Sequence, residues 1–219
     1  MRDKDERALR QEIVAVARIL AESGLISSSD GNISVKLDEE RFLATPSGLY
    51  KRTMTADDLI IVDGGGQLRA GRPGLRPTSE IKMHVEVYRQ RPDVAAVIHA
   101  HPPYTVALTV ADIPFPVDLI PEVLLALGDV PTAEYATPGT EALALSVRSL
   151  VRDHNAILLS HHGSLTVGTT LTETLIAVER LEAAARVHYL ANALGTPMPL
   201  PDAELERLRA MRRRRFERR

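Results

Sequence analysis

Two pairs of histidines stand at the ends of apolar stretches, and they are the residues best suited to do chemistry. His99 and His101 are separated by one residue at the end of an apolar run. Side chains alternate between the faces of a strand, so both rings would lie on one face, close enough to bind one ion. His161 and His162 end a second apolar run, directly before Gly163, which permits a tight turn. A third imidazole from this neighbouring strand would complete a three-histidine site with an open fourth position.

The other histidines have ordinary explanations, and the absence of cysteine narrows the possible ligands. His84, His154 and His188 are interpreted as exposed or packing residues. Without cysteine the chain has neither disulfides nor thiolate zinc sites, so any metal chemistry must use histidine and carboxylate. For the His99-x-His101 pair taken alone, two ordinary core or surface histidines remain an alternative.

Three further segments are rich in small, hydroxyl and amide groups. Thr78, Ser79 and Glu80 precede an amphipathic helix, where either hydroxyl would cap the helix and the carboxylate would favour its dipole. The same groups can also hold a phosphate, and a carboxylate beside a metal can move protons. The segments Gly31-Asn32-Ile33-Ser34 and Thr45-Pro46-Ser47-Gly48 suit an anion pocket but also suit plain turns. None of these segments has the spacing of a nucleotide-binding Walker motif.

Apolar periodicity predicts the elements that would position these groups. Helical spacing predicts helices over about residues 9–24, 79–91, 104–110, 140–150 and 172–195. Strands are predicted at residues 33–37, 41–44, 59–62, 95–101, 156–159 and 163–167. Prolines keep residues 113–138 irregular apart from a short apolar piece around Leu124. Helices and strands interleave and several connections are short, so we predict a three-layer α/β/α sandwich with a mixed, largely antiparallel central sheet.

The composition is that of an ordinary globular protein. The chain has 219 residues, of which 44% are hydrophobic and 26% charged, and its net charge of −2 favours neither nucleic acid nor membrane as a partner. We expect one domain over residues 1–219, with a basic C-terminal helix or tail over residues 202–219 whose arginines lie on a solvated face. The charged start is neither a secretory signal nor a transmembrane helix, so a cytoplasmic location is expected.

In their order along the chain, these motifs resemble the class II aldolase and adducin family, particularly its L-fuculose 1-phosphate aldolases. Each motif is weak alone, but their order and spacing are specific, and the resemblance covers nearly the whole chain. The matching motifs are Gly31-Asn32-x-Ser34, Pro77-Thr78-Ser79-Glu80, Arg91-Pro92-Asp93, His99-x-His101, Tyr135-Ala136-x-Pro138-Gly139-Thr140 and His162-Gly163.

The resemblance implies a role for each matching residue. His99, His101 and His162 would bind one zinc ion per subunit; His162 is preferred to His161 because the family's ligand directly precedes the glycine. Glu80 would be the catalytic acid/base. The residues that would bind the substrate phosphate are Asn32, Ser47, Gly48, Thr78 and Ser79.

The resemblance also implies the reaction and the assembly. Cleavage of a ketose 1-phosphate between C3 and C4 would give an enediolate, whose charge the zinc neutralises, and then dihydroxyacetone phosphate and a small aldehyde. Family members are similar in forming fourfold-symmetric tetramers with the active site at a subunit boundary. A homotetramer is therefore expected.

The chain departs from the family pattern at the aldehyde end of the substrate. Bacterial fuculose aldolases resemble one another in a tyrosine, donated across the subunit boundary, that serves as proton donor. The corresponding proline-rich segment here offers Asp118 and Glu122 and no tyrosine. Its stretch Ile120-Pro121-Glu122 looks more like archaeal-type members, so Glu122 is the candidate for that role.

Alternative functions remain open. A dehydratase of methylthioribulose 1-phosphate shares the metal and phosphate residues, whereas the ribulose phosphate 4-epimerases tend to carry Asp in place of Glu80. An adducin-like interaction module without catalysis is disfavoured because all three histidines are present. A Schiff-base aldolase is disfavoured because no lysine lies in an apolar run that would lower its pKa; the lysines are Lys4, Lys36, Lys51 and Lys82. The metal itself, zinc, cobalt or manganese, stays open.

Overall fold

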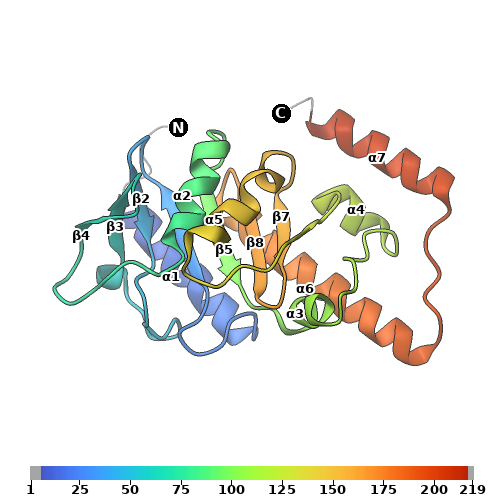
Figure 1. Cartoon of the computed structure of the whole chain (residues 1–219), viewed down its shortest axis with the longest axis horizontal. Helices are drawn as coiled ribbons and strands as arrows, with labels where there is room; N and C mark the ends of the chain where they lie inside the picture. The colour runs from blue at the N-terminus through green and yellow to red at the C-terminus, as the bar shows by residue number, and fades with distance from the viewer. Residues whose placement is uncertain (1–5, 217–219) are drawn as a thin grey trace.

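An eight-stranded sheet forms the middle layer of the protein (Figure 1). The computed structural model describes residues 6–216 of the chain, with side chains as far as residue 214. The strand order is β4-β3-β2-β1-β5-β8-β7-β6, and every neighbouring pair is antiparallel except the parallel pair of β6 and β7. The strands are β1 (Asn32–Lys36), β2 (Arg41–Ala44), β3 (Ile60–Asp63), β4 (Leu68–Ala70), β5 (Ala96–Ala100), β6 (Thr132–Ala133), β7 (Ala156–Leu159) and β8 (Gly163–Gly168).

Helices cover both faces of this sheet, which confirms the predicted three-layer sandwich. Helices α2 and α5 share one hydrophobic cluster with the sheet, and α1, α3 and α6 pack on the opposite face. The helices are α1 (Glu6–Glu22), α2 (Ile81–Gln90), α3 (Pro103–Val110), α4 (Pro121–Leu127), α5 (Glu141–Arg148), α6 (Leu171–Leu194) and α7 (Asp202–Phe216). Two short 3₁₀ helices, η1 (Ala56–Asp58) and η2 (Leu150–Arg152), complete the described elements.

The predicted apolar stripes are the surfaces that the helices bury. In α1, the side chains of Leu9, Ile13, Val16 and Leu20 are all buried in the cluster formed with α6 and the sheet. Each such side chain contributes about 1.5–3 kcal/mol of hydrophobic stabilisation when fully buried. The spacing in the sequence therefore fixes which side of α1 faces the sheet.

The structure adds two short strands that were not predicted, β4 and β6, and corrects the predicted cap of α2. The short apolar piece around Leu124 is a helix, α4. Neither Thr78 nor Ser79 caps α2, because the N-cap position is occupied by Glu80 and no side chain makes a capping hydrogen bond there. Glu80 therefore stands just before the first residue of α2, where its backbone is not helical and its side chain can turn toward the sheet.

The central strand β5 lies between β1 and β8 and brings the chemical groups together. In the β1–β5 ladder Asn32 is opposite His99, and in the β5–β8 ladder Ala100 is opposite Ser164. His162 directly precedes β8, so it stands beside the end of β5 at which His101 is found. Three segments, each more than about sixty residues from the next along the chain, thus meet at one place on the sheet.

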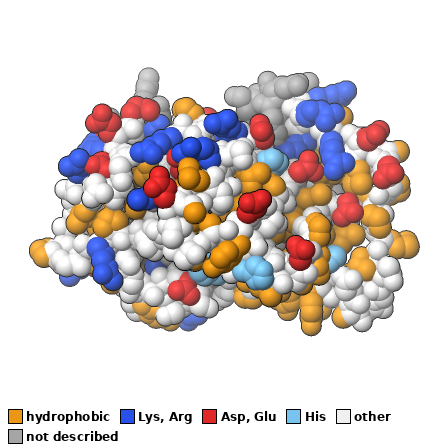
Figure 2. Space-filling model, in the orientation of Figure 1, with side chains coloured by type: hydrophobic (Ala, Val, Ile, Leu, Met, Phe, Trp, Pro, Cys, Tyr) orange, Lys and Arg blue, Asp and Glu red, His pale blue; other side chains and the backbone are white. Residues whose placement is uncertain are grey.

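Helix α7 packs against α4 at the opposite end of the molecule from β4 (Figure 1). Arg212 is not solvated as expected, because it donates hydrogen bonds to the carbonyl oxygens of Leu125 and Ala126 at the end of α4. The expected solvation does hold for Arg213 and Arg214, which are exposed, and Figure 2 shows basic side chains gathered over α7. Residues 217–219 of the predicted basic tail lie outside the described residues, and a single domain over residues 1–219 stays a prediction. Among the helices of residues 6–216, none has the length and apolar character needed to cross a bilayer.

Candidate metal centre

Three imidazole rings converge at the end of β5. The ring centroids of His99 and His101 are 4.6 Å apart, those of His99 and His162 are 4.6 Å apart, and those of His101 and His162 are 5.0 Å apart. One ring nitrogen from each lies within 4.8 Å of the other two. These are the three histidines that the sequence singled out as ligands, and the structure brings them together.

The environment of His99 leaves one nitrogen lone pair directed at this meeting point. Its Nδ1 is 2.9 Å from the carbonyl oxygen of Ser164, so Nδ1 carries the proton and Nε2 is a bare acceptor. Burial lowers the pKa of His99 to about 4, and burial likewise lowers the pKa of His101 to about 4. Both rings are therefore neutral near pH 7, the form that binds a metal.

A strained turn selects His162 over His161 as the third ring. His161 has a φ of 55°, which is unusual for a residue with a side chain. Its N–H donates to Thr109 Oγ1, and the next N–H, of His162, donates to the carbonyl oxygen of Leu159. The exposed ring of His161 faces Tyr135, 6.3 Å away between centroids, whereas His162 turns inward.

Gly163 is required at this turn because its Cα lies against the two other rings. A Cβ at this position would overlap the carbonyl oxygen of Ala100 and would come within 2.8 Å of His101 Cδ2 and 3.1 Å of His99 Cε1. The glycine expected from the sequence to permit a turn thus also lets β8 approach β5 closely.

The carboxylate of Glu80 reaches the same point from the start of α2. Glu80 Oε2 lies 3.4 Å from His99 Nε2 and accepts a hydrogen bond of 2.8 Å from Asn32 Nδ2. Glu80 Oε1 lies 3.1 Å from His162 Nε2. Burial alone would raise the pKa of Glu80, but the His162 and His99 rings and the Asn32 amide favour the ionised form, so the pKa of Glu80 is lowered.

This donor set fits a divalent cation, because imidazole nitrogens and carboxylate oxygens are the ligands that such ions take from proteins. The Nε2 atoms of His99 and His101 are only 2.8 Å apart, although His99 already uses its proton on Nδ1. Glu80 Oε1 is buried and has no hydrogen-bond partner. A buried polar atom without a partner costs about 1–3 kcal/mol, and a cation among these atoms would satisfy the lone pairs directed at one another.

Four of the five candidate phosphate-binding residues lie on loops beside Glu80, and the fifth, Asn32, begins β1. An isolated β-bridge between Pro46 and Pro77 joins the loop of Ser47 and Gly48 to the loop that precedes α2. The side chain of Asn32 contacts Thr78 Oγ1 at 3.3 Å as well as Glu80. The other groups are accessible, since Ser79 and Gly48 are exposed and Ser47 is half-buried. These loops therefore form an open polar rim next to the buried histidines.

Glu122 is not part of this cluster. It is exposed in the first turn of α4, the helix that packs on α6 and α7. The group of possible metal ligands found among the described residues includes the three histidines and not Glu122.

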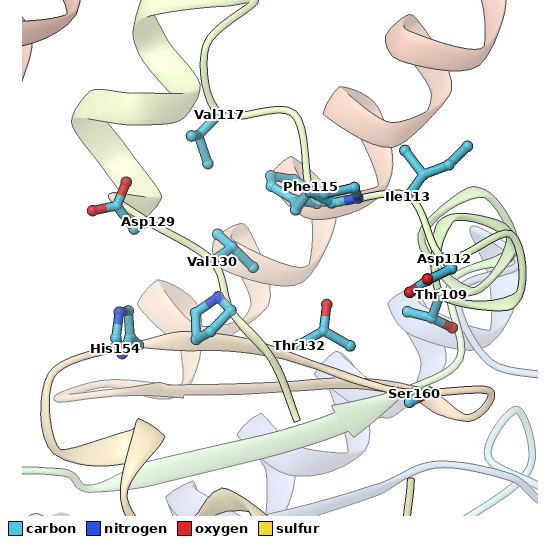
Figure 3. Close-up of a pocket in the computed structure, with 12 residues that line it drawn as sticks. Thr109, Asp112, Ile113, Phe115, Val117, Asp129, Val130, Thr132, His154 and Ser160 are labelled. Carbon is cyan, nitrogen blue, oxygen red and sulfur yellow. The ribbon is translucent and has the colours of Figure 1, made fainter. Parts of the chain in front are cut away.

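A separate cavity of about 460 Å³ lies behind the turn that carries His161 (Figure 3). Thr109 and Asp112 line one side of it, Val130 and His154 line the other, and Phe115 covers it. None of the three converging histidines contributes to its wall. The cavity is therefore distinct from the metal centre, with Thr109 between the two.

Lys51 corrects the expectation that no lysine has a lowered pKa. Burial lowers the pKa of Lys51 to about 8, partly opposed by the charge of Asp30. The residue is only 1% exposed, and its Nζ donates to the carbonyl oxygens of Ser29 and Leu49. The sequence missed this site because Lys51 is buried by loops distant in the chain. Because the amine is enclosed and makes two hydrogen bonds, a sugar has no room to form a Schiff base with it. A Schiff-base aldolase therefore stays disfavoured.

Residues 11–189 match the family model described as Class II Aldolase and Adducin N-terminal domain. The chain is 32% identical over 201 residues to a 5-deoxy-D-ribulose 1-phosphate aldolase of Bacillus thuringiensis, covering 91% of this chain and 92% of that protein. It is 33% identical over 180 residues to an L-fuculose phosphate aldolase of Methanococcus vannielii, covering 82% of this chain and 95% of that protein. A solved structure of an L-fuculose 1-phosphate aldolase superposes with a TM-score of 0.83 at 32% identity, covering 92% of this chain and 94% of that one.

Acidification should destabilise the metal-free protein. As the pH falls from 6.5 toward 4, the unfolded chain takes up protons on His84, His99 and His101, whereas the folded chain, in which burial lowers each pKa to about 4, does not. Stability is therefore lost across that window, by up to about 1.4 kcal/mol per pH unit for each residue. Urea unfolding of the metal-free protein at pH 7.5, 6.5 and 5.5 measures this slope, and equal stability at pH 6.5 and 5.5 would contradict it.

Replacing Gly163 with alanine should weaken metal binding about 10- to 100-fold, because the new methyl group displaces His101 and His99 from their shared point. Gly64→Ala is the matched control, since a Cβ there meets nothing within 4 Å. Zinc affinity is measured by competition with a chromophoric chelator, and circular dichroism checks the fold. Equal affinity in the two variants would mean that the close approach of β8 to β5 does not govern the site.

Proposed function

Because this chain belongs to the class II aldolase and adducin family, we propose that it is a zinc-dependent aldolase that reversibly cleaves a ketose 1-phosphate to dihydroxyacetone phosphate and a short aldehyde. The observation that carries the proposal is the convergence of His99, His101 and His162 on one point beside Glu80. A metal-dependent aldolase needs a cation to stabilise an enediolate and a base beside it; the three histidines would hold the cation and Glu80 would be the base.

His99, His101 and His162 would hold the zinc, leaving a fourth position that Glu80 or substrate can fill. When bound, the zinc supplies Lewis-acid stabilisation of the negative charge that develops on the substrate's carbonyl and hydroxyl oxygens. The protein's part is to hold these rings in place. Burial keeps the ring of His99 neutral, and the carbonyl oxygen of Ser164 orients the ring by accepting a hydrogen bond from its Nδ1–H.

Glu80 would move the proton. Its two oxygens are in different situations, because Oε2 is held by Asn32 at 2.8 Å while Oε1 has no hydrogen-bond partner. In synthesis, ionised Oε1 would remove a proton from C3 of dihydroxyacetone phosphate. In cleavage, a base would take the proton of the C4 hydroxyl as the C3–C4 bond breaks, and Glu80, protonated from solvent, would deliver a proton to C3. The hydrogen bond to Oε2 fixes the direction from which Oε1 approaches the substrate.

The loops beside Glu80 would bind the phosphate. Gly48 and Ser47 on one loop and Ser79 on the other present accessible backbone and hydroxyl groups, and Thr78 and Asn32 stand at the boundary with the buried site. This placement supports a substrate whose phosphate is at the open rim and whose ketone and adjacent hydroxyl are at the zinc.

The identity of the sugar depends on the aldehyde end. The similar proteins with known names act on a five-carbon 5-deoxy sugar in one case and on fuculose phosphate in another. We propose an L-fuculose 1-phosphate-like ketose, with the 5-deoxypentulose 1-phosphate as the competing substrate. A methylthioribulose 1-phosphate dehydratase or a 4-epimerase would leave all carbons in one molecule, and a non-enzymatic adducin-like module would give no product.

A cytoplasmic homotetramer is the proposed form of the protein. The outer half of α6 exposes a row of apolar side chains that a second copy can cover: Val187, Tyr189, Leu190 and Leu194. Figure 2 shows hydrophobic side chains gathered at the α4 and α6 side of the molecule. Glu122, exposed on α4 on the same side, would then be available to a neighbouring subunit's substrate as its proton donor.

Product analysis tests the reaction. The zinc-loaded protein, incubated with L-fuculose 1-phosphate, 5-deoxy-D-ribulose 1-phosphate or methylthioribulose 1-phosphate, should release dihydroxyacetone phosphate from at least one of them. Mass spectrometry of the trapped aldehyde identifies the sugar, because cleavage at C3–C4 gives a different aldehyde from each. His99→Ala should lose zinc and activity, whereas His154→Ala, at the other end of β7, should keep both. If the substrate instead lost water, or if one of its stereocentres were inverted, and no aldehyde was released, the protein would be a dehydratase or an epimerase and not an aldolase.

Glu80→Gln should retain the metal but lower kcat by about 10²- to 10⁴-fold, as expected when a positioned acid/base is removed. Glu39→Gln is the matched control, because the Glu39 side chain is 87% exposed. Zinc content and steady-state kinetics are measured on both variants. An unchanged kcat in Glu80→Gln would remove this carboxylate from the proton transfer while leaving the metal site intact.

A further inference from the structure

Three side chains of α2 form a polar row beneath the metal centre. Glu80, His84 and Tyr88 are spaced by four residues, so they lie on one side of the helix, which faces β1. His84 is 1% exposed and Tyr88 is 5% exposed. His84, expected from the sequence to be an exposed or packing residue, is thus buried, one helical turn from the candidate acid/base.

Ser34 on β1 joins His84 and Tyr88 in a chain of hydrogen bonds. Ser34 Oγ lies 2.8 Å from the hydroxyl of Tyr88 and 2.7 Å from Nδ1 of His84. Ser34 is fully buried, and Tyr88 stacks on Phe42 with ring centroids 4.5 Å apart, which closes the far end of the chain. Within this group of three hydrogen-bonded side chains, the polar atom that is left without a partner is the remaining ring nitrogen of His84, Nε2.

The protons in this chain have one favourable order. If Tyr88 donates to Ser34, then Ser34 donates to Nδ1 of His84, and Nε2 must carry the proton of the neutral ring. In the reverse order, His84 Nδ1–H would donate to Ser34 and the Ser34 hydroxyl would donate to Tyr88. The Tyr88 hydroxyl proton would then have no acceptor, and the bare lone pair of His84 Nε2 would lie near a carboxylate. Burial lowers the pKa of His84 to about 4, so the ring is neutral, and burial raises the pKa of Tyr88 above its ordinary value, so the phenol keeps its proton.

The unpaired Nε2 of His84 is in the electrostatic field of the site. It is buried and has no hydrogen-bond partner, and Asn32 Oδ1 beside Glu80 is a second buried atom without one. Glu80 is the charged group that acts on His84, and His84 in turn acts on His99. Because Nε2 has no hydrogen-bond partner among the described side chains, an N–H there would act on the carboxylate of Glu80 through one buried water that Asn32 Oδ1 also binds.

We propose that His84 is a positioning residue for Glu80: Ser34 holds the neutral ring so that its Nε2–H donates to a buried water, which in turn donates to Asn32 Oδ1 and to the carboxylate of Glu80. The inference rests on the proposed function, because it concerns how the acid/base of that reaction is held. Asn32 fixes Oε2 from β1, and His84 supplies a second buried donor from the helix itself. Together they leave Oε1 free on the metal side.

Two substitutions separate the two nitrogens of His84. In His84→Asn the amide lies where Nδ1 was and can keep the contact with Ser34, but nothing replaces Nε2–H. In His84→Gln the amide reaches the position of Nε2 and can donate there. We expect His84→Asn to lower kcat by about tenfold or more, with KM within about twofold, and His84→Gln to recover most of the loss. Val85→Ala, a buried neighbour without polar contacts, should lower the melting temperature but leave kcat unchanged.

Solid-state ¹⁵N NMR of the zinc-loaded, histidine-labelled protein tests the proton order without any substrate. The signals of His84 are identified by their loss in His84→Gln. A protonated Nε2 with a bare Nδ1 is expected in the wild type, and Ser34→Ala should shift this pattern. A protonated Nδ1, or equal kcat values for His84→Asn and His84→Gln, would overturn the proposal. If the wild type cleaves no sugar phosphate, the proposed function fails, and the NMR result alone decides the role of Ser34 and His84.

Discussion

The structure depends on one electrostatic constraint: three imidazole lone pairs and a carboxylate face one another in a buried space. The Nε2 atoms of His99 and His101 approach to 2.8 Å, and Glu80 comes within 3.4 Å of the first. Without a cation, Glu80 Oε1 has no hydrogen-bond partner and the imidazole nitrogens crowd one another, so the surrounding sheet must hold these groups in place. The backbone ladders of β5 with β1 and β8 supply that rigidity, since they fix the start of each side chain independently of what the rings do.

Much of the fold could be predicted because periodicity reports directly on burial. The stripes of α1 and α6 and the six predicted strands correspond to elements with an interior face. The strands β4 and β6 lie at the two edges of the sheet, and β4 is exposed throughout. An edge strand of two or three residues has little buried side to produce alternation, so only its pairing with a neighbour defines it.

The sequence predicted the site residues whose placement follows from their position along a strand. It did not predict those whose placement depends on contacts with segments distant in the sequence. Strand alternation placed His99 and His101 together, but residue spacing alone did not choose between His161 and His162. That choice follows from the left-handed backbone of His161, held by Thr109 more than fifty residues away. Lys51 and His84 were missed for the same reason, since loops and strands distant in the sequence bury them.

The division between strands and loops has a consequence for specificity. The groups that would hold the metal and the proton are on strand ends and a helix end, whereas Ser47, Gly48 and Ser79 are on loops joined by a single β-bridge. Glu122, the predicted candidate for the aldehyde end, is exposed on α4 and is not part of the histidine group. If the proposed function holds and Glu122 contacts the aldehyde end, the α4 segment can change without disturbing the metal centre, and the same centre can then serve different aldehydes.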